Sequence, residues 1–436
     1  MVRTLNLIEK KFENFIIKNS KYIVNKKIGI GVSGGPDSLS LAILLNKYRT
    51  KYNLDLFAFT IDHQLRIESQ KEAKFVKSCM DKLSICHKTI VWKKPHSQHN
   101  ILETARIARY NLIAKECIKN DIDLIMIGHH ANDQIETFII RLEANSGLDG
   151  LACMKSNTTI ITDFTKLNII RPLLNFEKKD LKEVCRKTNI NWVSDPTNYN
   201  LKYKRTKARY IAKNKSLSHD FKLVINQYSK LKLNIDKLLN NQIKKNVKFN
   251  DNGICEIKNE FIKKLPKLFQ KKILILLIKI IGGKKYPRKS LIINRIITNI
   301  HDVNINNFTA GGVYFIKSKN IILLIRQNEP SINQIILQYK TTIWDRRFLI
   351  TKQCHTSNIS VGPLTEKDYI NMVKLKKIQK TKMPFAAIKT LPTFRVLDEI
   401  VSIPHLLYYK NYLWKKNIKI EHIENDLFIS CNKLYI

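Results

Sequence analysis

Acidic residues are scarce in this chain of 436 residues. It carries 36 Asp and Glu against 77 Lys and Arg, which gives a formal net charge of +41. Such an excess favours polyanionic partners, because each phosphate that a cation neutralises releases counterions. A coding bias towards Lys, Ile and Asn explains part of the lysine content, but it does not explain the shortage of acids. We therefore expect a nucleic acid as partner.

Paired cysteines and long apolar runs are also lacking. The eight cysteines form no Cys-x-x-Cys pair, which argues against a zinc ribbon or a disulfide framework. The longest apolar run, 273–282, is interrupted by Lys279 and is too short to cross a bilayer. Residues 1–27 show no signal-peptide core. These features predict a cytoplasmic protein that has no membrane partner.

The basic charge is unevenly distributed along the chain. Residues 1–210 have a net charge of +15 and the remainder has +26, so the acids needed for catalysis are concentrated in the first half. The length exceeds the roughly 100–200 residues of a usual domain. We predict a catalytic domain over 1–212, a mainly helical polyanion-binding domain over 213–330 and a polyanion-binding C-terminal domain over 331–436.

Apolar runs alternate with amphipathic segments from residue 26 onward. The strand candidates are 27–32, 56–61, 87–92 and 123–128, and the helix candidates are 38–48, 69–83 and 101–120. This alternation predicts an α/β fold with a Rossmann-like parallel sheet and helices on both faces. Ligands of such sheets bind at the carboxyl ends of the strands. The motifs described below all begin where a predicted strand ends.

The pattern changes in the second half of the chain. Helical periodicity extends from 221 to about 300, and short strands are predicted at 311–316 and 321–325. After a break at 328–330, a mixed α+β region opens with strand candidates at 335–339 and 342–351. Trp344 and Phe348 could stack on bases. Aromatic residues on strands more often belong to a core, so we predict that these two are buried.

A glycine-rich loop follows the first predicted strand. Residues 29–34 match G-x-G-x-x-G, but the first two glycines fall inside the strand, and a Walker loop is excluded because no Gly-Lys-Ser/Thr follows. The better candidate is the segment that joins this strand to the next helix: Ser33, Gly34, Gly35, Pro36, Asp37 and Ser38. Two glycines permit a tight turn, and the helix N-terminus attracts anions. The segment therefore predicts a phosphate-binding loop in which Asp37 holds Mg²⁺.

The loop resembles that of the PP-loop ATP pyrophosphatases, the N-type group, which release AMP and pyrophosphate. Three further segments are similar to the tRNA(Ile)-lysidine synthetases within that group. They are Asp62-His63-Gln64-Leu65-Arg66, the series Asn100, Glu103, Ala105, Arg106, Arg109 and Tyr110, and the segment 128–137 with His129, His130, Asp133, Gln134, Glu136 and Thr137. The resemblance is dense over residues 25–210 and looser beyond them.

The resemblance implies a C–N bond-forming ligase. Members of that family use ATP to adenylate the wobble cytidine of a tRNA(Ile) with a CAU anticodon. They then join L-lysine to this base and release AMP and pyrophosphate. The modified base decodes AUA instead of AUG, and the tRNA accepts isoleucine instead of methionine. The expected substrates are therefore ATP, with Mg²⁺, L-lysine and tRNA(Ile). A homodimer is one possible assembly.

The resemblance also implies roles for individual residues. Catalysis is expected from Asp37, His129 and Arg205. The expected ATP contacts are Ser33, Gly34, Gly35, Pro36, Asp37, Ser38 and Asp62. The expected lysine contacts are Arg109, Asp133 and Glu136. The expected tRNA contacts are Arg66, Tyr203, Arg205 and Arg209.

Each of these roles has a simpler alternative. Asp133 and Glu136, three residues apart, could merely complement a helix dipole, and the basic segment around Arg205 could be a solvated linker. His129 is either a polar contact or a proton acceptor. Because adjacent histidines on a helix cannot face one ion, His129 and His130 do not predict a metal site.

The chain departs from the family pattern at a few positions. Ala144-Asn145 stands where an Arg-Gly pair is usual, Tyr203 where Phe is usual, and Thr206 where Asn is usual. Three other functions stay open at this point: a PP-loop tRNA thiolase, an NAD synthetase-like amidotransferase, and a nucleic-acid-binding protein without catalysis. The lack of Cys-x-x-Cys argues against the cytidine type of thiolase, and the basic second half argues against NAD synthetase.

Overall fold

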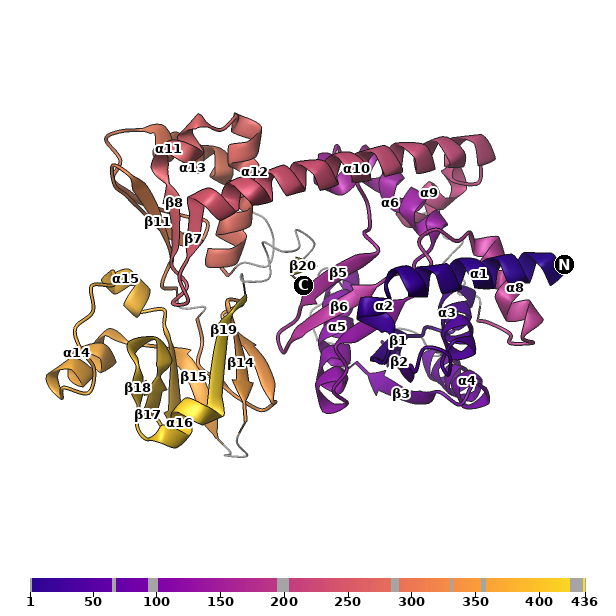
Figure 1. The fold of residues 1–436 in the computed structure, drawn as a ribbon, viewed down its shortest axis with the longest axis horizontal. Coiled ribbons are helices and arrows are strands. Elements are labelled where there is room, and N and C mark those ends of the chain that lie inside the picture. Colours follow the sequence, from indigo (N-terminus) through magenta and orange to yellow (C-terminus); the bar gives the residue numbers. More distant parts are fainter. Residues whose placement is uncertain are drawn as a thin grey trace. The chain divides into compact units, whose positions relative to one another are not determined.

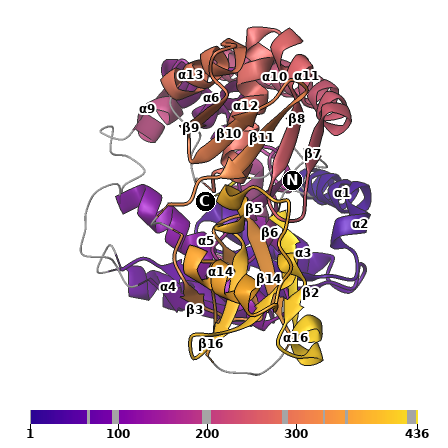
Figure 2. The same ribbon diagram turned by 90° about the vertical axis from the view of Figure 1, so that its left-hand side faces the viewer.

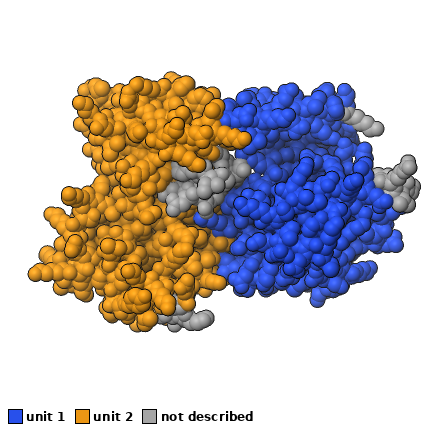
Figure 3. Space-filling model, viewed as in Figure 1, with its two compact units in different colours: residues 1–160, 166–235 blue, residues 161–165, 236–436 orange. Residues whose placement is uncertain are grey.

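The computed structural model describes residues 2–64, 68–92, 101–193, 204–283, 290–329, 332–353, 358–423 and 434–435. The chain forms two compact units (Figure 3). The first contains residues 1–160 and 166–235, and the second contains residues 161–165 and 236–436. The domain boundaries predicted at 212 and 330 stay predictions.

The first unit is built on a largely parallel sheet (Figure 1). Its strands are β1 (Lys27–Gly31), β2 (Asp55–Asp62), β3 (Cys86–Val91), β4 (Leu124–Ile127), β5 (Asn157–Ile161) and β6 (Lys166–Ile170). Their spatial order is β5-β6-β4-β1-β2-β3. The pairs β1–β2, β1–β4, β2–β3 and β4–β6 are parallel. The predicted α/β class is therefore confirmed.

Ten helices accompany this sheet in the described residues. They are α1 (Val2–Lys18), α2 (Ser20–Ile23), α3 (Pro36–Lys47), α4 (Ser69–Lys82), α5 (Ile101–Lys119), α6 (Ala131–Glu143), α7 (Leu148–Leu151), α8 (Lys178–Lys187), α9 (Lys204–Ile211) and α10 (Lys215–Asn246). One large core joins α1, α3, α4 and α8 to the alternate residues of the strands that face them, such as Ile28 and Ile30 of β1. This alternation is the two-residue period of a strand.

The strand order contains a topological switch next to β1. The chain runs from β1 outward to β2 and β3, and then returns to place β4 on the other side of β1. In open α/β sheets, ligands generally bind at such a switch point, beyond the carboxyl ends of the two strands. The phosphate loop follows β1 and the His129-His130 segment follows β4. The fold thus brings two of the predicted motifs together.

The second unit begins with an antiparallel sheet flanked by helices (Figure 2). Its strands are β7 (Val247–Phe249), β8 (Cys255–Lys258), β9 (Asn307–Ala310), β10 (Val313–Lys317) and β11 (Ile321–Arg326), in the order β7-β8-β11-β10-β9. The helices α11 (Asn259–Lys264), α12 (Lys267–Ile281) and α13 (Ser290–His301) pack against these strands. The strands predicted near 311–316 and 321–325 are confirmed, whereas the hairpin β7–β8 interrupts the helical stretch predicted over 221–300.

Two further sheets complete the second unit. One has the order β12-β15-β16-β17-β18 and the other the order β13-β14-β19. Their strands are β12 (Ile335–Ile336), β13 (Thr341–Trp344), β14 (Phe348–Lys352), β15 (Ile359–Pro363), β16 (Pro392–Val396), β17 (Glu399–Ile403), β18 (Tyr408–Tyr409) and β19 (Ile418–His422). The helices α14 (Glu366–Lys374), α15 (Phe385–Ile388) and α16 (Tyr412–Asn417) and the 3-10 turn Pro404–Leu406 lie among them.

Aromatic residues fill the centre of these C-terminal sheets. Trp344 and Phe348 are 1% and 0% exposed, and their ring centroids lie 6.1 Å apart, so the predicted core role of both residues is confirmed. The single strand candidate at 342–351 was wrong, because the chain reverses there. Asp345 and Arg346 have φ values of 47° and 57° and form the turn of the hairpin β13–β14.

None of the described helices combines the length and the apolar character needed to cross a membrane.

Candidate active site

The phosphate loop adopts a tight turn between β1 and α3. Gly34 has a φ of +81°, a left-handed conformation that favours glycine. The Ser33 amide donates to Ser38 Oγ at 3.1 Å, and Ser38 Oγ donates to the Gly35 carbonyl at 3.1 Å. Pro36 begins α3 and Asp37 lies in its first turn. The loop therefore presents a helix N-terminus and two hydroxyl groups, which suits a phosphate group.

Gly128, at the end of β4, lets the two motifs approach each other. A Cβ atom there would lie 2.6 Å from the Asp37 carbonyl oxygen and 3.1 Å from the Ser38 amide nitrogen. Backbone atoms cannot yield to such a clash, so a side chain at this position would push β4 away from α3. The glycine thus sets the spacing between the phosphate loop and the His129-His130 segment.

His130 connects the phosphate loop to α6. Its Nδ1 accepts a hydrogen bond from the Asn132 amide at 3.2 Å, so the neutral ring carries its proton on Nε2. Nε2 lies 3.4 Å from Asp37 Oδ2 and 3.6 Å from Asp133 Oδ2. Burial works against the charged form, yet the hydrogen bond to Asp37 and the charge of Asp133 outweigh it and raise the pKa of His130. One buried imidazole thus joins the predicted Mg²⁺ residue to the predicted lysine site.

Asp37 has one carboxylate oxygen that fits a metal ion. Oδ1 is buried and has no hydrogen-bond partner in the described part of the chain, whereas Oδ2 faces His130 and lies 3.9 Å from Lys178 Nζ. The described residues contain no group of three His, Cys, Asp or Glu that could hold a metal by itself. A single protein carboxylate is typical of Mg²⁺ sites that are completed by nucleotide phosphates and water.

Asp133 and Glu136 lie in the first two turns of α6, and both are buried, at 9% and 2% exposure. Arg205 Nη2 donates to Asp133 Oδ1 at 2.5 Å, and Arg205 Nε donates to Glu136 Oε2 at 2.8 Å. Arg209 Nε donates to Glu136 Oε1 at 2.8 Å. The carboxylates and the two arginines, all predicted from the sequence, therefore form one cluster between α6 and α9.

The charge of Asp133 is stabilised by its neighbours. Burial favours the protonated acid, but the nearby charges of His130 and Arg205 and the His130 amide, which donates to Asp133 Oδ2 at 3.0 Å, hold the pKa of Asp133 below its ordinary value. This last bond also caps α6. The helix-dipole alternative for Asp133 thus describes part of its role, and the bonds to Arg205 add a second.

His129 points to different partners from those of His130. Arg171 Nε donates to His129 Nδ1 at 3.2 Å, and burial lowers the pKa of His129 to about 4. Arg171 is 4% exposed, and its Nη1 donates at 3.0 Å to both the Lys155 carbonyl and Thr158 Oγ1. His129 is therefore a neutral ring at physiological pH, held by a buried arginine.

A further cluster lies at the ends of β2 and β3. Asp62 is 7% exposed, and its Oδ1 accepts from the Gln64 amide at 2.9 Å. Arg109 Nη2 donates to His63 Nε2 at 3.1 Å, and the His63 ring meets the Trp92 ring edge-on at 5.5 Å. Burial lowers the pKa of His63 to about 4, so this ring accepts the bond as a neutral imidazole. Arg109 thus contacts the β2 motif in this structure.

Two predicted tRNA contacts, Arg66 and Tyr203, lie outside the described residues. The backbone conformation at Asn145 accounts for one departure from the family pattern, the asparagine in place of glycine. Its φ of 48° is a conformation that glycine adopts readily and that asparagine tolerates better than most residues. Thr206, the other described departure, is buried at 9% exposure on α9.

Sequence reasoning assigned no role to three residues that the structure places at the site. They are His130, Lys178 and Arg171. His130 stands inside the motif 128–137, but its partner Asp37 lies on another element, and the partner of Arg171, His129, is distant in sequence. Lys178 opens α8, and its amide donates to Asn132 Oδ1 at 3.2 Å. Only the folded chain shows that these side chains converge.

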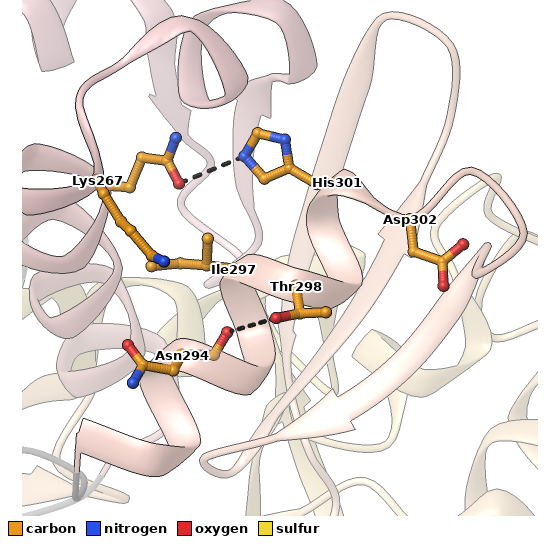
Figure 4. Close-up of a pocket in the computed structure, with 7 residues that line it drawn as sticks. Lys267, Asn294, Ile297, Thr298, His301 and Asp302 are labelled. Carbon is orange, nitrogen blue, oxygen red and sulfur yellow. Dashed lines mark hydrogen bonds between the residues drawn. The ribbon is translucent and has the colours of Figure 1, made fainter.

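A separate cavity of about 620 Å³ lies in the second unit (Figure 4). It is lined by Lys267, Gln270, Asn294, Ile297, Thr298, His301 and Asp302, from α12, α13 and the segment that follows α13. His301 Nε2 and Gln270 Oε1 lie 3.4 Å apart. The cavity has no phosphate loop, so the carboxyl ends of β1 and β4 remain the candidate active site.

Three features define a PP-loop enzyme that uses ATP: the strand order of the sheet, the phosphate loop, and the unpartnered carboxylate oxygen of Asp37 in the described residues. In agreement, the PP-loop domain family matches residues 5–214. Relatives named tRNA(Ile)-lysidine synthase match the chain almost throughout. Those of Rickettsia felis and Orientia tsutsugamushi are 31% and 29% identical over 406 residues, with 89% of this chain and 91% and 90% of the relative covered. The chain therefore belongs to the tRNA(Ile)-lysidine synthase family, which consists of ATP-dependent ligases.

Among solved structures, the U34-tRNA thiolase of Methanococcus maripaludis superposes with a TM-score of 0.46. Its sequence is 17% identical to this chain, and the match covers 53% of this chain and 80% of that chain.

Proposed function

We propose that this protein ligates L-lysine to the wobble cytidine of a tRNA(Ile) with a CAU anticodon. ATP adenylates the cytidine, lysine then displaces AMP, and pyrophosphate is the other product. The family membership supports this function over a thiolase, an NAD synthetase-like amidotransferase or a protein that only binds RNA. The observation that carries the proposal is the position of His130, within 3.6 Å of both Asp37 and Asp133, because it links a phosphate loop to a buried carboxylate pair.

The loop residues Ser33, Gly34, Gly35, Pro36, Asp37 and Ser38, together with Asp62, bind ATP in this proposal. Mg²⁺ held by Asp37 would neutralise charge that develops on the phosphates as pyrophosphate leaves. The hydroxyl groups of Ser33 and Ser38 and the amides at the start of α3 orient the phosphates. We place the nucleoside beside Asp62, which lies at the end of the neighbouring strand β2.

Asp133 and Glu136 bind the ammonium groups of lysine, and Arg109 binds its carboxylate. The binding of ammonium groups by Asp133 and Glu136 is supported by their present partners, because both carboxylates already hold guanidinium groups, those of Arg205 and Arg209. A site that binds two cations at 2.5–2.8 Å is suited to a third when the arginines shift. The ε-amine of free lysine has a pKa of about 10.4, so it must lose a proton before it attacks.

The tRNA binds to Arg66, Tyr203, Arg205 and Arg209 near the site and to the basic remainder of the chain, which carries a net charge of +26 after residue 210. Arg205 has a catalytic role in this proposal, since it could leave the carboxylates and contact the adenylated base. We expect the reaction to take place in the cytoplasm, where tRNA is modified. A homodimer stays a prediction.

One experiment tests the function as a whole. The purified chain is incubated with ATP, Mg²⁺, labelled lysine and total tRNA, and the RNA is then treated with mild alkali. Lysine joined to a base survives this treatment, whereas lysine esterified to a tRNA 3′ end does not. Label that is lost completely in alkali, or that never reaches RNA, would refute the proposal.

A further inference from the structure

The buried guanidinium of Arg171 determines which nitrogen of His129 carries the proton. Arginine has only hydrogen-bond donors and is always charged, so the atom that receives its Nε–H must be an acceptor. That atom is His129 Nδ1, at 3.2 Å. A neutral imidazole that accepts at Nδ1 has its single proton on Nε2. Nε2 itself has no hydrogen-bond partner among the residues that the structure describes.

Other contacts hold Arg171 in place. Its Nη1 donates at 3.0 Å to the Lys155 carbonyl and to Thr158 Oγ1, and only 4% of the residue is exposed. Arg171 begins the segment after β6, beside β4, and His129 follows β4. Burial, the largest effect on the ring, lowers the pKa of His129 to about 4, in agreement with a ring that stays neutral near pH 7.

We infer that Arg171 is a positioning residue that fixes His129 as the Nε2–H tautomer, so that His129 donates a hydrogen bond to a substrate oxygen and does not take the lysine proton. The claim that His129 donates to a substrate oxygen and does not take the lysine proton rests on the proposed function. Nε2 already carries a proton, and the lone pair of Nδ1 is engaged by Arg171, so neither nitrogen is free to accept one. Of the two roles open for His129, polar contact or proton acceptor, the geometry selects the first.

The tautomer can be observed directly in the full chain without substrates. Nuclear magnetic resonance of ¹⁵N-labelled histidine distinguishes Nε2–H, Nδ1–H and the imidazolium, and the His129→Gln variant assigns the signal. The expected result is the Nε2–H form at pH 7. An Nδ1–H ring or an imidazolium would overturn the inference. Because no substrate is present, this result is independent of whether the protein modifies tRNA.

Variants then test whether Arg171 acts through His129. Arg171→Met should leave His129 as a mixture of tautomers, whereas Thr158→Val, which removes a different partner of Arg171, should keep the Nε2–H form. An unchanged tautomer in Arg171→Met would contradict the positioning role. If Arg171→Met does not fold, the Thr158→Val and wild-type spectra still decide the tautomer.

Turnover measurements distinguish a His129 that donates a hydrogen bond from a His129 that accepts a proton. The amide nitrogen of glutamine can approach the position of Nε2, and that of asparagine the position of Nδ1. His129→Gln should therefore retain turnover within about tenfold of wild type, and His129→Asn should lose roughly ten times more. Arg171→Met should add little to the loss in His129→Gln, since their effects are coupled. Equal losses in the two His129 variants, or full additivity with Arg171→Met, would refute the donor role.

Discussion

Arg205 donates to two carboxylates at once, with Nη2 2.5 Å from Asp133 Oδ1 and Nε 2.8 Å from Glu136 Oε2. The two acids lie on α6 and the arginine lies on α9, so the bonds fasten one helix to the other. The carboxylates are buried, whereas about half of the Arg205 side chain is exposed. Arg205 can therefore leave the acids and become hydrated, and a cationic substrate could take its place beside the buried carboxylates.

We predict that the loop directs cleavage to the α-phosphate. Asp37→Asn removes the carboxylate whose Oδ1 is buried without a partner in the described residues, and it should abolish turnover because a neutral amide binds Mg²⁺ less strongly than a carboxylate does. In the wild type, AMP and pyrophosphate should form in equal amounts with modified tRNA, and chelation of Mg²⁺ should stop both. Chromatography of the nucleotides measures this. ADP and phosphate as the stoichiometric products would contradict the prediction.

Lysine recognition is predicted to depend on the carboxylate pair. Asp133→Asn and Glu136→Gln each remove one charge, and each should raise the KM for lysine by roughly tenfold or more, because a hydrogen bond to a charged group contributes about 1.5–3 kcal/mol. ATP binding should change little. Glu143→Gln, at the exposed end of the same helix, is the matched control. Wild-type lysine dependence in both site variants would show that the acids only anchor Arg205 and Arg209.

The two halves of the chain differ in how well their sequence predicted them. In the first unit, the apolar runs and the helix that follows each run gave the elements within a few residues, since β1, α3 and β4 lie close to the predicted segments. One prediction in the second unit failed where a turn lacked its usual residues. The hairpin β13–β14 turns at Asp345 and Arg346, both with positive φ, and neither is the glycine that marks such turns in a sequence.

The candidate site likewise contains residues that could be predicted from the sequence and residues that could not. Asp37, Asp133 and Glu136 were predicted because each stands in a motif that follows a strand, and Arg205 and Arg209 because the family resemblance implied them. The role of His130 could not be predicted, because it depends on the approach of α3 to β4, which Gly128 permits. The bond between Arg171 and His129 likewise joins residues 42 positions apart.

Stability is predicted to fall on acidification through the half-buried His405. Burial lowers the pKa of His405 to about 4, from an ordinary value of 6.5. Below pH 6.5 the unfolded chain binds a proton that the folded His405 does not bind until about pH 4, so unfolding is favoured increasingly between these values. The slope from one such residue is at most about 1.4 kcal/mol per pH unit.

Urea unfolding at several pH values between 7.5 and 4.5 measures this effect. The midpoint of the wild type should fall as the pH decreases, and His405→Gln should reduce that fall. His219→Gln, at an exposed position, should not. Identical pH dependence in His405→Gln and the wild type would show that His405 does not contribute.

The last prediction separates catalysis from tRNA binding. Arg205→Ala should reduce turnover at saturating tRNA by roughly tenfold to a hundredfold, because it frees two buried carboxylates and removes a cation from the site. Its effect on tRNA affinity should be small, since one contact among many is lost. The double variant Lys415→Glu and Lys416→Glu changes two exposed residues of α16 and should show the reverse, with weaker binding and near-normal turnover at saturation. Filter binding and single-turnover kinetics compare the variants. Unimpaired turnover in Arg205→Ala would show that Arg205 only holds α9 against α6.

The tRNA affinity of the wild type should fall steeply with salt, by nearly one unit of log K per phosphate contact for each tenfold rise in salt concentration. Salt-insensitive affinity would reject the electrostatic basis of binding.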